Sequence, residues 1–183
     1  QILVPSDMPV QTRVLTEQGW SSFQEYFVKN HCKPFVRQVE FNGSDEATAA
    51  PAALAAIDAA EAIIIAPSNP VLSIGPILSV KPLAKAIRDS GKPVIAVSPI
   101  IAGKAIKGPA ARIMRGLGMR VDAVGVAQCY SDLCKMMVID NSDAGLSGEI
   151  TDLGMTATVV NNVMNERDNK IELAGRILDA IGL

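Results

Sequence analysis

The sequence contains very little histidine: His31 is the only one among 183 residues. A zinc site built from several histidines and a serine or cysteine catalytic triad are therefore both disfavoured. We expect His31 to lie on the surface at the end of a helix. The sequence also has no G-x-G-x-x-G motif after any predicted strand, so positive evidence for a dinucleotide-dependent oxidoreductase is missing.

An excess of positive charge is absent as well. The 17 basic and 19 acidic residues give a net charge of −2, so no overall field attracts nucleic acid or an anionic membrane surface. Cys32, Cys129 and Cys134 are an odd number without paired C-x-x-C spacing, which indicates reduced core thiols in a cytoplasm. Apolar runs such as residues 62–67 are far shorter than the roughly 20 residues that span a bilayer, so we expect a cytoplasmic protein without a transmembrane helix.

What the sequence does contain is an alternation of short β-branched runs and longer segments of helical period. This pattern is typical of parallel βαβ units, and near-continuous hydrophobicity of the strands predicts helices on both faces of the sheet. With 183 residues and 49% hydrophobic side chains, one α/β domain over residues 1–183 is expected. The predicted strands are 62–66, 94–98, 136–140 and 156–160, and the predicted helices are 20–31, 51–60, 77–89, 109–117, 122–134 and 167–181.

Some local features refine this outline. Pro82 lies inside the predicted helix 77–89 and predicts a kink or a later start. Residues 141–152 are rich in Asn, Ser, Asp and Gly, which predicts a long mobile loop. The chain begins at Gln1 and continues with Ile2-Leu3-Val4, the pattern of a strand already in progress, without an initiator Met or a signal peptide. We therefore expect the start of the protein to be missing.

The first loop whose side chains could bind a substrate is residues 67–76, directly after a predicted buried strand. Two hydroxyls and an amide, from Ser68, Ser73 and Asn69, lie between three prolines that stiffen the turn. Ligands of open parallel sheets bind beyond the carboxyl ends of the strands, and a stiff loop lowers the cost of ordering. Gly75 would allow close backbone approach, and the amides of the following helix could receive a phosphate. Alternatively, Ser68 and Asn69 only cap a turn.

The second loop, residues 98–109, again follows a predicted strand and leads to a helix. It begins at Ser98, and its two glycines and two lysines, among them Lys107 and Gly108, could cradle a diphosphate. It is not a Walker A loop, because Pro109 stands where the lysine should follow Gly108. A solvated basic turn explains the same residues.

A third loop offers carboxylates after the strand that ends near Ile139. Asp140, Asp143, Glu149 and Asp152 could hold Mg²⁺ through oxygen ligands. We favour ordinary surface carboxylates in a flexible loop, so no metal ligand is assigned to this chain.

Several ordered motifs together resemble the 2-phospho-L-lactate transferase family of deazaflavin coenzyme biosynthesis. The resemblance covers essentially the whole chain and is carried by residues 66–78 (APSNPVLSIGPIL), 96–100 (AVSPI), 107–110 (KGPA), 138–140 (VID), 7–10 (DMPV), Arg13 and 23–27 (FQEYF). It implies a Rossmann-like three-layer sandwich with a mostly parallel sheet, and we expect this chain to lack the N-terminal strands of that sheet.

The resemblance also implies an activity. Family members transfer a 2-phospholactyl group from guanosine diphospho-lactate to the ribityl hydroxyl of a deazaflavin and release GMP, using Mg²⁺, in coenzyme F-420 biosynthesis. Related members use enolpyruvyl or glyceryl donors, and a homodimer is expected from the family. Ser68, Asn69, Pro70, Ser73, Gly75, Ser98, Lys107 and Gly108 would then contact substrate, with Lys107 and Gly108 contributing phosphate electrostatics.

The chain departs from the family pattern at one point. The N-terminal Gly-rich turn and the nearby acidic residues implicated in deazaflavin and metal binding are not in this chain. The catalytic residues are thus expected on preceding sequence, and the chain alone is expected to be inactive. Two other functions remain open: a nonenzymatic nucleotide-sugar-binding regulator of a related family, and a plain interaction domain.

Overall fold

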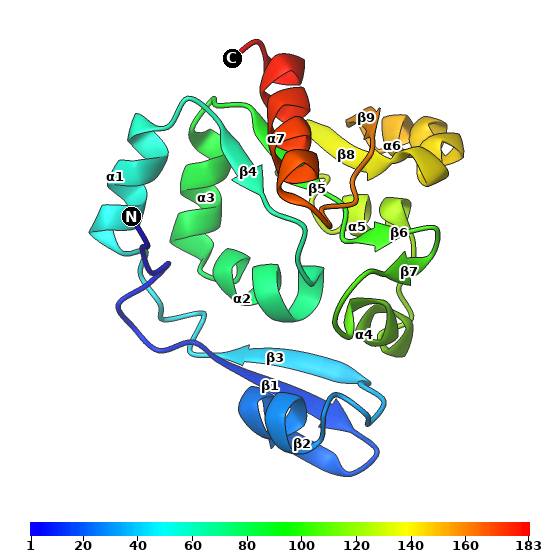
Figure 1. Ribbon diagram of the computed structural model, residues 1–183. Helices are drawn as coiled ribbons and strands as arrows, with labels where there is room; N and C mark the ends of the chain where they lie inside the picture. The colour runs from blue at the N-terminus through cyan, green and yellow to red at the C-terminus, as the bar shows by residue number, and fades with distance from the viewer. The chain divides into compact units, whose positions relative to one another are not determined.

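The computed structural model describes residues 1–183, which form two compact units (Figure 1). Unit 1 consists of residues 1–60, 69–91 and 107–119, and unit 2 consists of residues 61–68, 92–106 and 120–183. The chain therefore passes between the units several times. That the two units act as a single domain stays a prediction.

Unit 2 is built on a four-stranded sheet. Its strands are β4 (Ile63–Ile65), β5 (Val94–Val97), β8 (Met136–Asp140) and β9 (Thr156–Val160), in the order β4-β5-β8-β9. Every neighbouring pair is parallel. The four predicted strands and the predicted parallel α/β architecture are confirmed.

The C-terminal helix α7 (Arg167–Ile181) has the predicted bounds and covers one face of this sheet. Its Leu173 and Ile177 pack against Ile95, Val97 and Val138 in one core cluster. Because side chains alternate along a strand, Met137 and Ile139 point to the opposite face, where both are fully buried. Both faces are thus covered, as continuous hydrophobic strands require.

The rest of unit 2 differs from the prediction in two segments. Residues 141–152 are helical, forming the 3₁₀ helix η3 (Asn141–Leu146) and α6 (Ser147–Asp152), so the predicted mobile loop is wrong. Ile150 is fully buried and anchors this segment. Helix α5 (Ala123–Gln128) is much shorter than predicted, and the small hairpin of β6 (Ile100–Ile101) and β7 (Lys104–Ala105) was not predicted.

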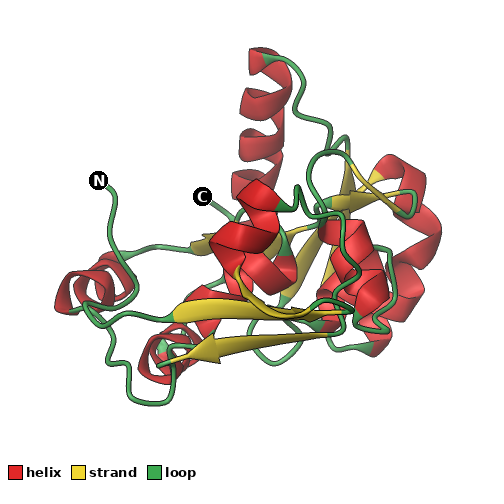
Figure 2. Ribbon diagram, turned by 90° about the horizontal axis from the view of Figure 1, so that it is seen from below, coloured by secondary structure: helices red, strands yellow, loops and turns green.

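Unit 1 contains an antiparallel sheet that the sequence pattern did not predict (Figure 2). Its order is β2-β1-β3, with β1 (Gln11–Thr16), β2 (Gly19–Ser22) and β3 (Gln38–Asn42). The predicted helix 20–31 is wrong in its first part, because Trp20 pairs with Leu15 in the β1–β2 hairpin. Residues 23–29 remain helical and include the π-helical turn η1 (Glu25–Lys29), in which Phe27 is 48% exposed.

The helices of unit 1 follow the prediction in part. They are α1 (Pro51–Ala59), the π-helical turn η2 (Pro70–Ile74), α2 (Gly75–Leu78), α3 (Lys81–Asp89) and α4 (Ala110–Gly116). Helices α1, α3 and α4 lie within the predicted helices, but residues 70–76 of the first predicted loop are helical. The predicted interruption near Pro82 is confirmed, because α2 ends at Leu78 and Pro82 lies in the first turn of α3. The core of this unit contains Val14, Tyr26, Cys32, Val36, Leu72 and Ile113.

Residues 1–10 form neither a strand nor a helix. Ile2 is 98% exposed, so the predicted strand in progress at residues 2–4 is wrong. No single helix has the length and hydrophobicity to cross a membrane. The helical segments 70–78 and 81–89, which are bent by 85° relative to each other, have the length and composition of a membrane span only when they are taken together. All three cysteines are free thiols, as predicted.

Candidate functional site

The two predicted substrate loops contribute to both units. In unit 1, η2 contacts α4, and Leu72 and Ile113 belong to the same core cluster. This contact brings together the helical part of the first loop, with Asn69, Pro70, Ser73 and Gly75, and the helix that follows Lys107 and Gly108. In unit 2, Ser68 and Ser98 follow the adjacent parallel strands β4 and β5 at the carboxyl edge of the sheet, where open α/β sheets bind ligands.

Asn69 stabilises the backbone of the first loop. Its Oδ1 accepts hydrogen bonds from the backbone N–H of Val71 at 2.9 Å and of Leu72 at 3.1 Å, so it caps η2. Its carbonyl also accepts from the N–H groups of Ser73 and Ile74. The turn-capping role left open by the sequence is therefore present, and contact of Asn69 with substrate stays a prediction.

Replacing Asn69 with alanine should lower the free energy of unfolding by about 1 kcal/mol, because two backbone donors lose their acceptor. Asn69→Asp is the matched control, since a carboxylate oxygen can accept the same bonds and should restore most of the stability. Urea unfolding followed by circular dichroism measures both. Equal stability of the alanine variant and the wild type would show that the cap contributes nothing.

Gly75 is needed for packing in unit 1. Its backbone is helical, with φ −50°, and a Cβ at this position would lie 2.8 Å from Cζ of Phe41. The missing side chain thus makes room for an aromatic ring. Pro70 is buried, whereas the Ser73 side chain is exposed and free to meet a ligand.

Ser98 is buried and its hydroxyl forms a local turn. The Oγ donates to the carbonyl of Ile100 at 2.8 Å and accepts from the N–H of the same residue at 3.2 Å. Its carbonyl accepts a 2.7 Å hydrogen bond from Nδ2 of Asn162. Ser98 therefore shapes the entry to the second loop and ties the end of β5 to the segment after β9.

Asp140 connects the ends of two strands at the same edge. Its Oδ1 accepts from the N–H of Ser142 at 2.9 Å and its Oδ2 accepts from the N–H of Asn162 at 3.0 Å. Burial of the carboxyl raises its pKa, but the hydrogen bonds from Ser142 and Asn162 outweigh this and lower the pKa below its usual value. The carboxylate thus stays ionised.

Asn162 was not predicted as a site residue. The sequence feature that could have indicated it is the pair of amide side chains, Asn161 and Asn162, directly after the apolar strand β9. Its side chain is 2% exposed, and its Oδ1 has no hydrogen-bond partner. Next to it, the ends of β8 and β9 border a hollow of about 270 Å³ lined by Asn141, Val159, Val160, Asn161, Glu172, Leu173 and Arg176.

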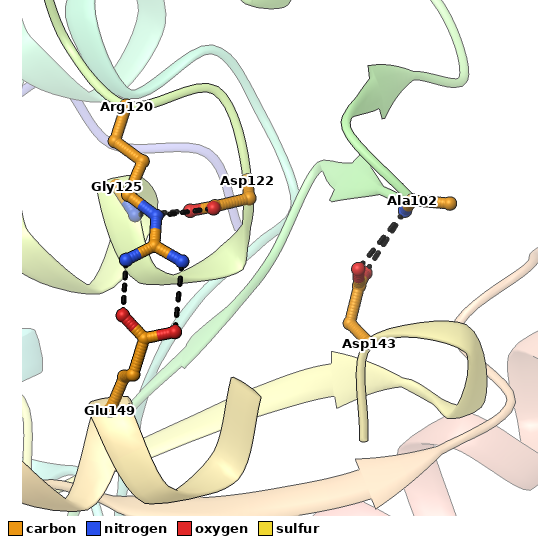
Figure 3. A network of polar contacts seen from close by, with 6 residues as sticks. All are labelled: Ala102, Arg120, Asp122, Gly125, Asp143 and Glu149. Carbon is orange, nitrogen blue, oxygen red and sulfur yellow. Dashed lines mark hydrogen bonds and ion pairs between the residues drawn. The ribbon is translucent and has the colours of Figure 1, made fainter. Parts of the chain in front are cut away.

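Two further carboxylates of the third loop, those of Asp143 and Glu149, are already engaged, whereas Asp152 is exposed (Figure 3). Both oxygens of Asp143 accept from the N–H of Ala102 at 3.1 Å, and burial raises the pKa of Asp143 above its usual value. Arg120 forms a bidentate ion pair with Glu149 and also contacts Asp122. No group of three or more His, Cys, Asp or Glu side chains could hold a metal, so the Mg²⁺ site considered for the third loop is not formed. Asp140 and Asp143 are buried, so the expectation of surface carboxylates is also wrong for them.

Lys107 and Gly108 complete the predicted set. Both are exposed, and Gly108 has φ +74°, the left-handed region that favours glycine. Their exposure and the ammonium group of Lys107 are compatible with a phosphate contact.

The parallel sheet, its helical cover and the polar loops at the carboxyl edge define a Rossmann-like α/β protein. A family model described as "2-phospho-L-lactate transferase CofD" matches residues 1–171. The chain belongs to this family.

Curated relatives support the same assignment. The chain is 34% identical to a 2-phospho-L-lactate transferase of Methanococcoides burtonii over 177 residues, covering 97% of this chain and 57% of the relative. It is 36% identical to that of Methanosarcina mazei, with 98% and 58% covered. A 42% identical match to the enzyme of Halobacterium salinarum covers 78% and 41%. The chain thus spans a little over half the length of the first relatives.

Solved structures show the same fold. The protein BH3568 from Bacillus halodurans matches with a TM-score of 0.63 at 15% sequence identity, over 97% of this chain and 61% of that protein. A second structure of the same protein, described as a member of the upf0052 family, matches with a TM-score of 0.56 at 14% identity, over 93% of this chain and 59% of that protein. At these identities the likeness concerns the fold alone.

Proposed function

We propose that the chain is part of a transferase that moves a 2-phospholactyl group from guanosine diphospho-lactate to a deazaflavin. The acceptor is the ribityl hydroxyl of 7,8-didemethyl-8-hydroxy-5-deazariboflavin, and the leaving group is GMP, as in coenzyme F-420 biosynthesis. The observation that carries this proposal is the family match over residues 1–171. The enolpyruvyl and glyceryl donors that related members use would react in the same way.

In this reaction the acceptor oxygen forms a bond to the distal phosphorus of the donor. The bond from this phosphorus to the oxygen of GMP breaks, and the hydroxyl proton is released. Such a displacement needs in-line placement of the two oxygens and stabilisation of the charge on the phosphoryl oxygens. The groups that fit these tasks are the ammonium of Lys107, the exposed hydroxyl of Ser73 and the polar groups of Ser68 and Asn69.

The remaining predicted residues shape the loops in which they lie. Ser98 and Pro70 are buried and fix the backbone at the start of the two loops, and Gly75 accommodates Phe41. We assign no catalytic residue within 1–183, and we expect the 183-residue chain alone to be inactive. The homodimer expected from the family stays a prediction.

Mg²⁺ is part of the proposal as a cofactor that neutralises charge on the diphosphate. The carboxylates of the third loop do not fit a metal site, because Asp140, Asp143 and Glu149 are engaged with backbone N–H groups or with Arg120 and no group of three or more His, Cys, Asp or Glu side chains could hold an ion. We therefore assign no step of the reaction to the metal on these residues.

Calorimetry on the full-length protein separates the transferase from a nucleotide-sugar-binding regulator. The proposal predicts that the deazaflavin binds and that a UDP-sugar does not. Tight binding of a UDP-sugar without affinity for the deazaflavin would favour the regulator instead. Failure to bind any nucleotide or deazaflavin would favour a plain interaction domain.

A further inference from the structure

We propose that a cationic hollow in unit 1 binds a phosphate group whose carrier also has a flat aromatic ring. The hollow has a volume of about 490 Å³ and is lined by Phe27, His31, Cys32, Gly108, Pro109 and Arg112. Its size lies in the range of small-molecule sites, roughly 300–1,000 Å³. It joins the turn after η1 to the end of the second predicted loop.

The lining of the hollow offers positive charge without a competing carboxylate. Its ionisable residues are His31, Cys32 and Arg112, and burial raises the pKa of the Cys32 thiol, which is therefore neutral at pH 7. The Arg112 guanidinium donates one long hydrogen bond, from Nη1 to the carbonyl of Cys32 at 3.4 Å. Its other donors form none of the described ion pairs, and a guanidinium presents a fork that suits phosphate oxygens.

Neighbouring charges add to this field. Lys107 is exposed and directly precedes Gly108. The acidic residue of η1, Glu25, is paired with Lys29 at 2.9 Å. An anion entering the hollow thus meets unpaired cations.

Phe27 supplies an aromatic wall. Its side chain is 48% exposed, and its ring stacks on Phe23 with centroids 5.3 Å apart and an interplanar angle of 28°. Because Phe23 covers one face of the ring, the ring is held in place while part of it stays open to solvent. A flat ligand ring can stack on such a side chain, as bases do on aromatic residues of proteins that bind nucleic acids.

The turn between these groups is strained and fixed. His31 and Cys32 are consecutive non-glycine residues with φ of 48° and 54°. The N–H of Cys32 donates to the carbonyl of Tyr26 at 3.0 Å, and the Tyr26 hydroxyl donates back to the carbonyl of Cys32 at 3.3 Å. Backbone strain of this kind persists only where surrounding contacts impose it, and it concentrates at ligand sites. The wall of the hollow is therefore formed before a ligand arrives.

Which molecule binds in the hollow rests on the proposed function, whereas the inference that the ligand carries a phosphate and a flat ring does not. In the proposed reaction, the guanosine nucleotide and the phosphorylated deazaflavin product both combine a flat ring with a phosphate. Either can occupy the hollow by the same contacts, and the experiment has to distinguish them.

The test is calorimetry on the full-length protein with GMP and with riboflavin 5′-phosphate, which stands in for a phosphorylated deazaflavin. Guanosine and riboflavin serve as the probes without phosphate. Arg112→Gln should weaken binding of at least one phosphorylated probe by tenfold or more and leave the unphosphorylated ones unchanged. Arg115→Gln is the matched control, because Arg115 is an exposed residue of the same helix outside the lining. Thermal melting confirms that each variant is folded.

A second variant tests the aromatic wall. Phe27→Leu should weaken binding of GMP or riboflavin 5′-phosphate several-fold without changing the affinity for inorganic phosphate. Equal affinity of wild type and Arg112→Gln for both phosphorylated probes would overturn the proposal, as would inorganic phosphate binding as tightly as either of them. If binding depends on Arg112 but the protein releases no GMP, the proposed function is refuted, whereas the proposed binding site in the hollow is still supported.

Discussion

Replacing Gly125 with alanine is expected to lower the free energy of unfolding by at least about 3 kcal/mol. A Cβ at this position would lie 1.9 Å from the carbonyl oxygen of Arg120 and 2.7 Å from its carbonyl carbon. Both atoms are backbone, so no side chain can rotate away. Gly125 cannot shift either, because its N–H donates to Oδ1 of Asp122 at 2.9 Å, the N-cap bond of the buried helix α5 (Ala123–Gln128) (Figure 3).

Gly148→Ala provides the matched control for this substitution. Gly148 is also helical, in α6, but a Cβ added there would meet no atom within 4 Å outside its own helix turn. Alanine there should raise stability by about 0.5–1 kcal/mol, since it restricts the unfolded chain and favours the helix. Guanidinium unfolding compares the two variants. A Gly125→Ala protein as stable as the wild type would contradict the close approach of α5 to Arg120.

Asp140→Asn is expected to cost about 2–3 kcal/mol at pH 7. The buried carboxylate accepts one hydrogen bond on each oxygen, from the N–H groups of Ser142 and Asn162. Asparagine has a single acceptor oxygen, so one of these buried donors would face an NH₂ group. The ends of β8 and β9 would lose the link that holds them together at the carboxyl edge of the sheet.

The pH dependence of this effect has a definite sign. Because the pKa of Asp140 is lowered in the folded protein, its contribution is complete above the carboxyl pKa of the unfolded chain, about 4. The contribution is lost as the pH falls through the folded value. The stability difference between wild type and Asp140→Asn should thus be largest near pH 7 and shrink below about pH 4.

Asp143→Asn is the control with the opposite trend. The pKa of Asp143 is raised, chiefly by burial, so its ionised form is disfavoured in the folded protein. Wild type should therefore gain stability relative to Asp143→Asn as the pH falls from neutrality through the folded pKa of Asp143. Unfolding curves at about pH 7, 5 and 3.5 measure both differences. Parallel pH profiles for the two variants would contradict the assigned environments.

The parts of the fold that were predictable are those with strong local patterns. The central strands β5 and β8 are short apolar runs buried on both faces, and the bounds of α7 followed from its helical spacing of apolar residues. The buried side of α7 was less predictable, because Leu173 packs inward with Ile177 while Ile171 and Leu178 are exposed. The antiparallel sheet of unit 1 was not predictable in the same way. Its β2 strand depends on pairing of Trp20 with Leu15, and this cross-strand pairing replaces the start of the helix that was predicted for residues 20–31.

The candidate site shows the same limit. The positions of the two loops after β4 and β5 followed from the strand pattern. The structural roles of Asn69, Gly75 and Ser98 did not, because they depend on contacts that are visible only in the structure. Arg112 and the carbonyl of Cys32 are 80 residues apart in sequence. No local motif indicates that these two segments line one hollow.

The transfer reaction itself is the most direct test of the proposed function. Full-length protein is incubated with 7,8-didemethyl-8-hydroxy-5-deazariboflavin, guanosine diphospho-lactate and Mg²⁺, and nucleotides and deazaflavins are separated by chromatography with mass detection. The proposal predicts equal amounts of GMP and of the phospholactyl deazaflavin, and loss of both when a chelator removes the metal. A folded protein that forms neither product would contradict it.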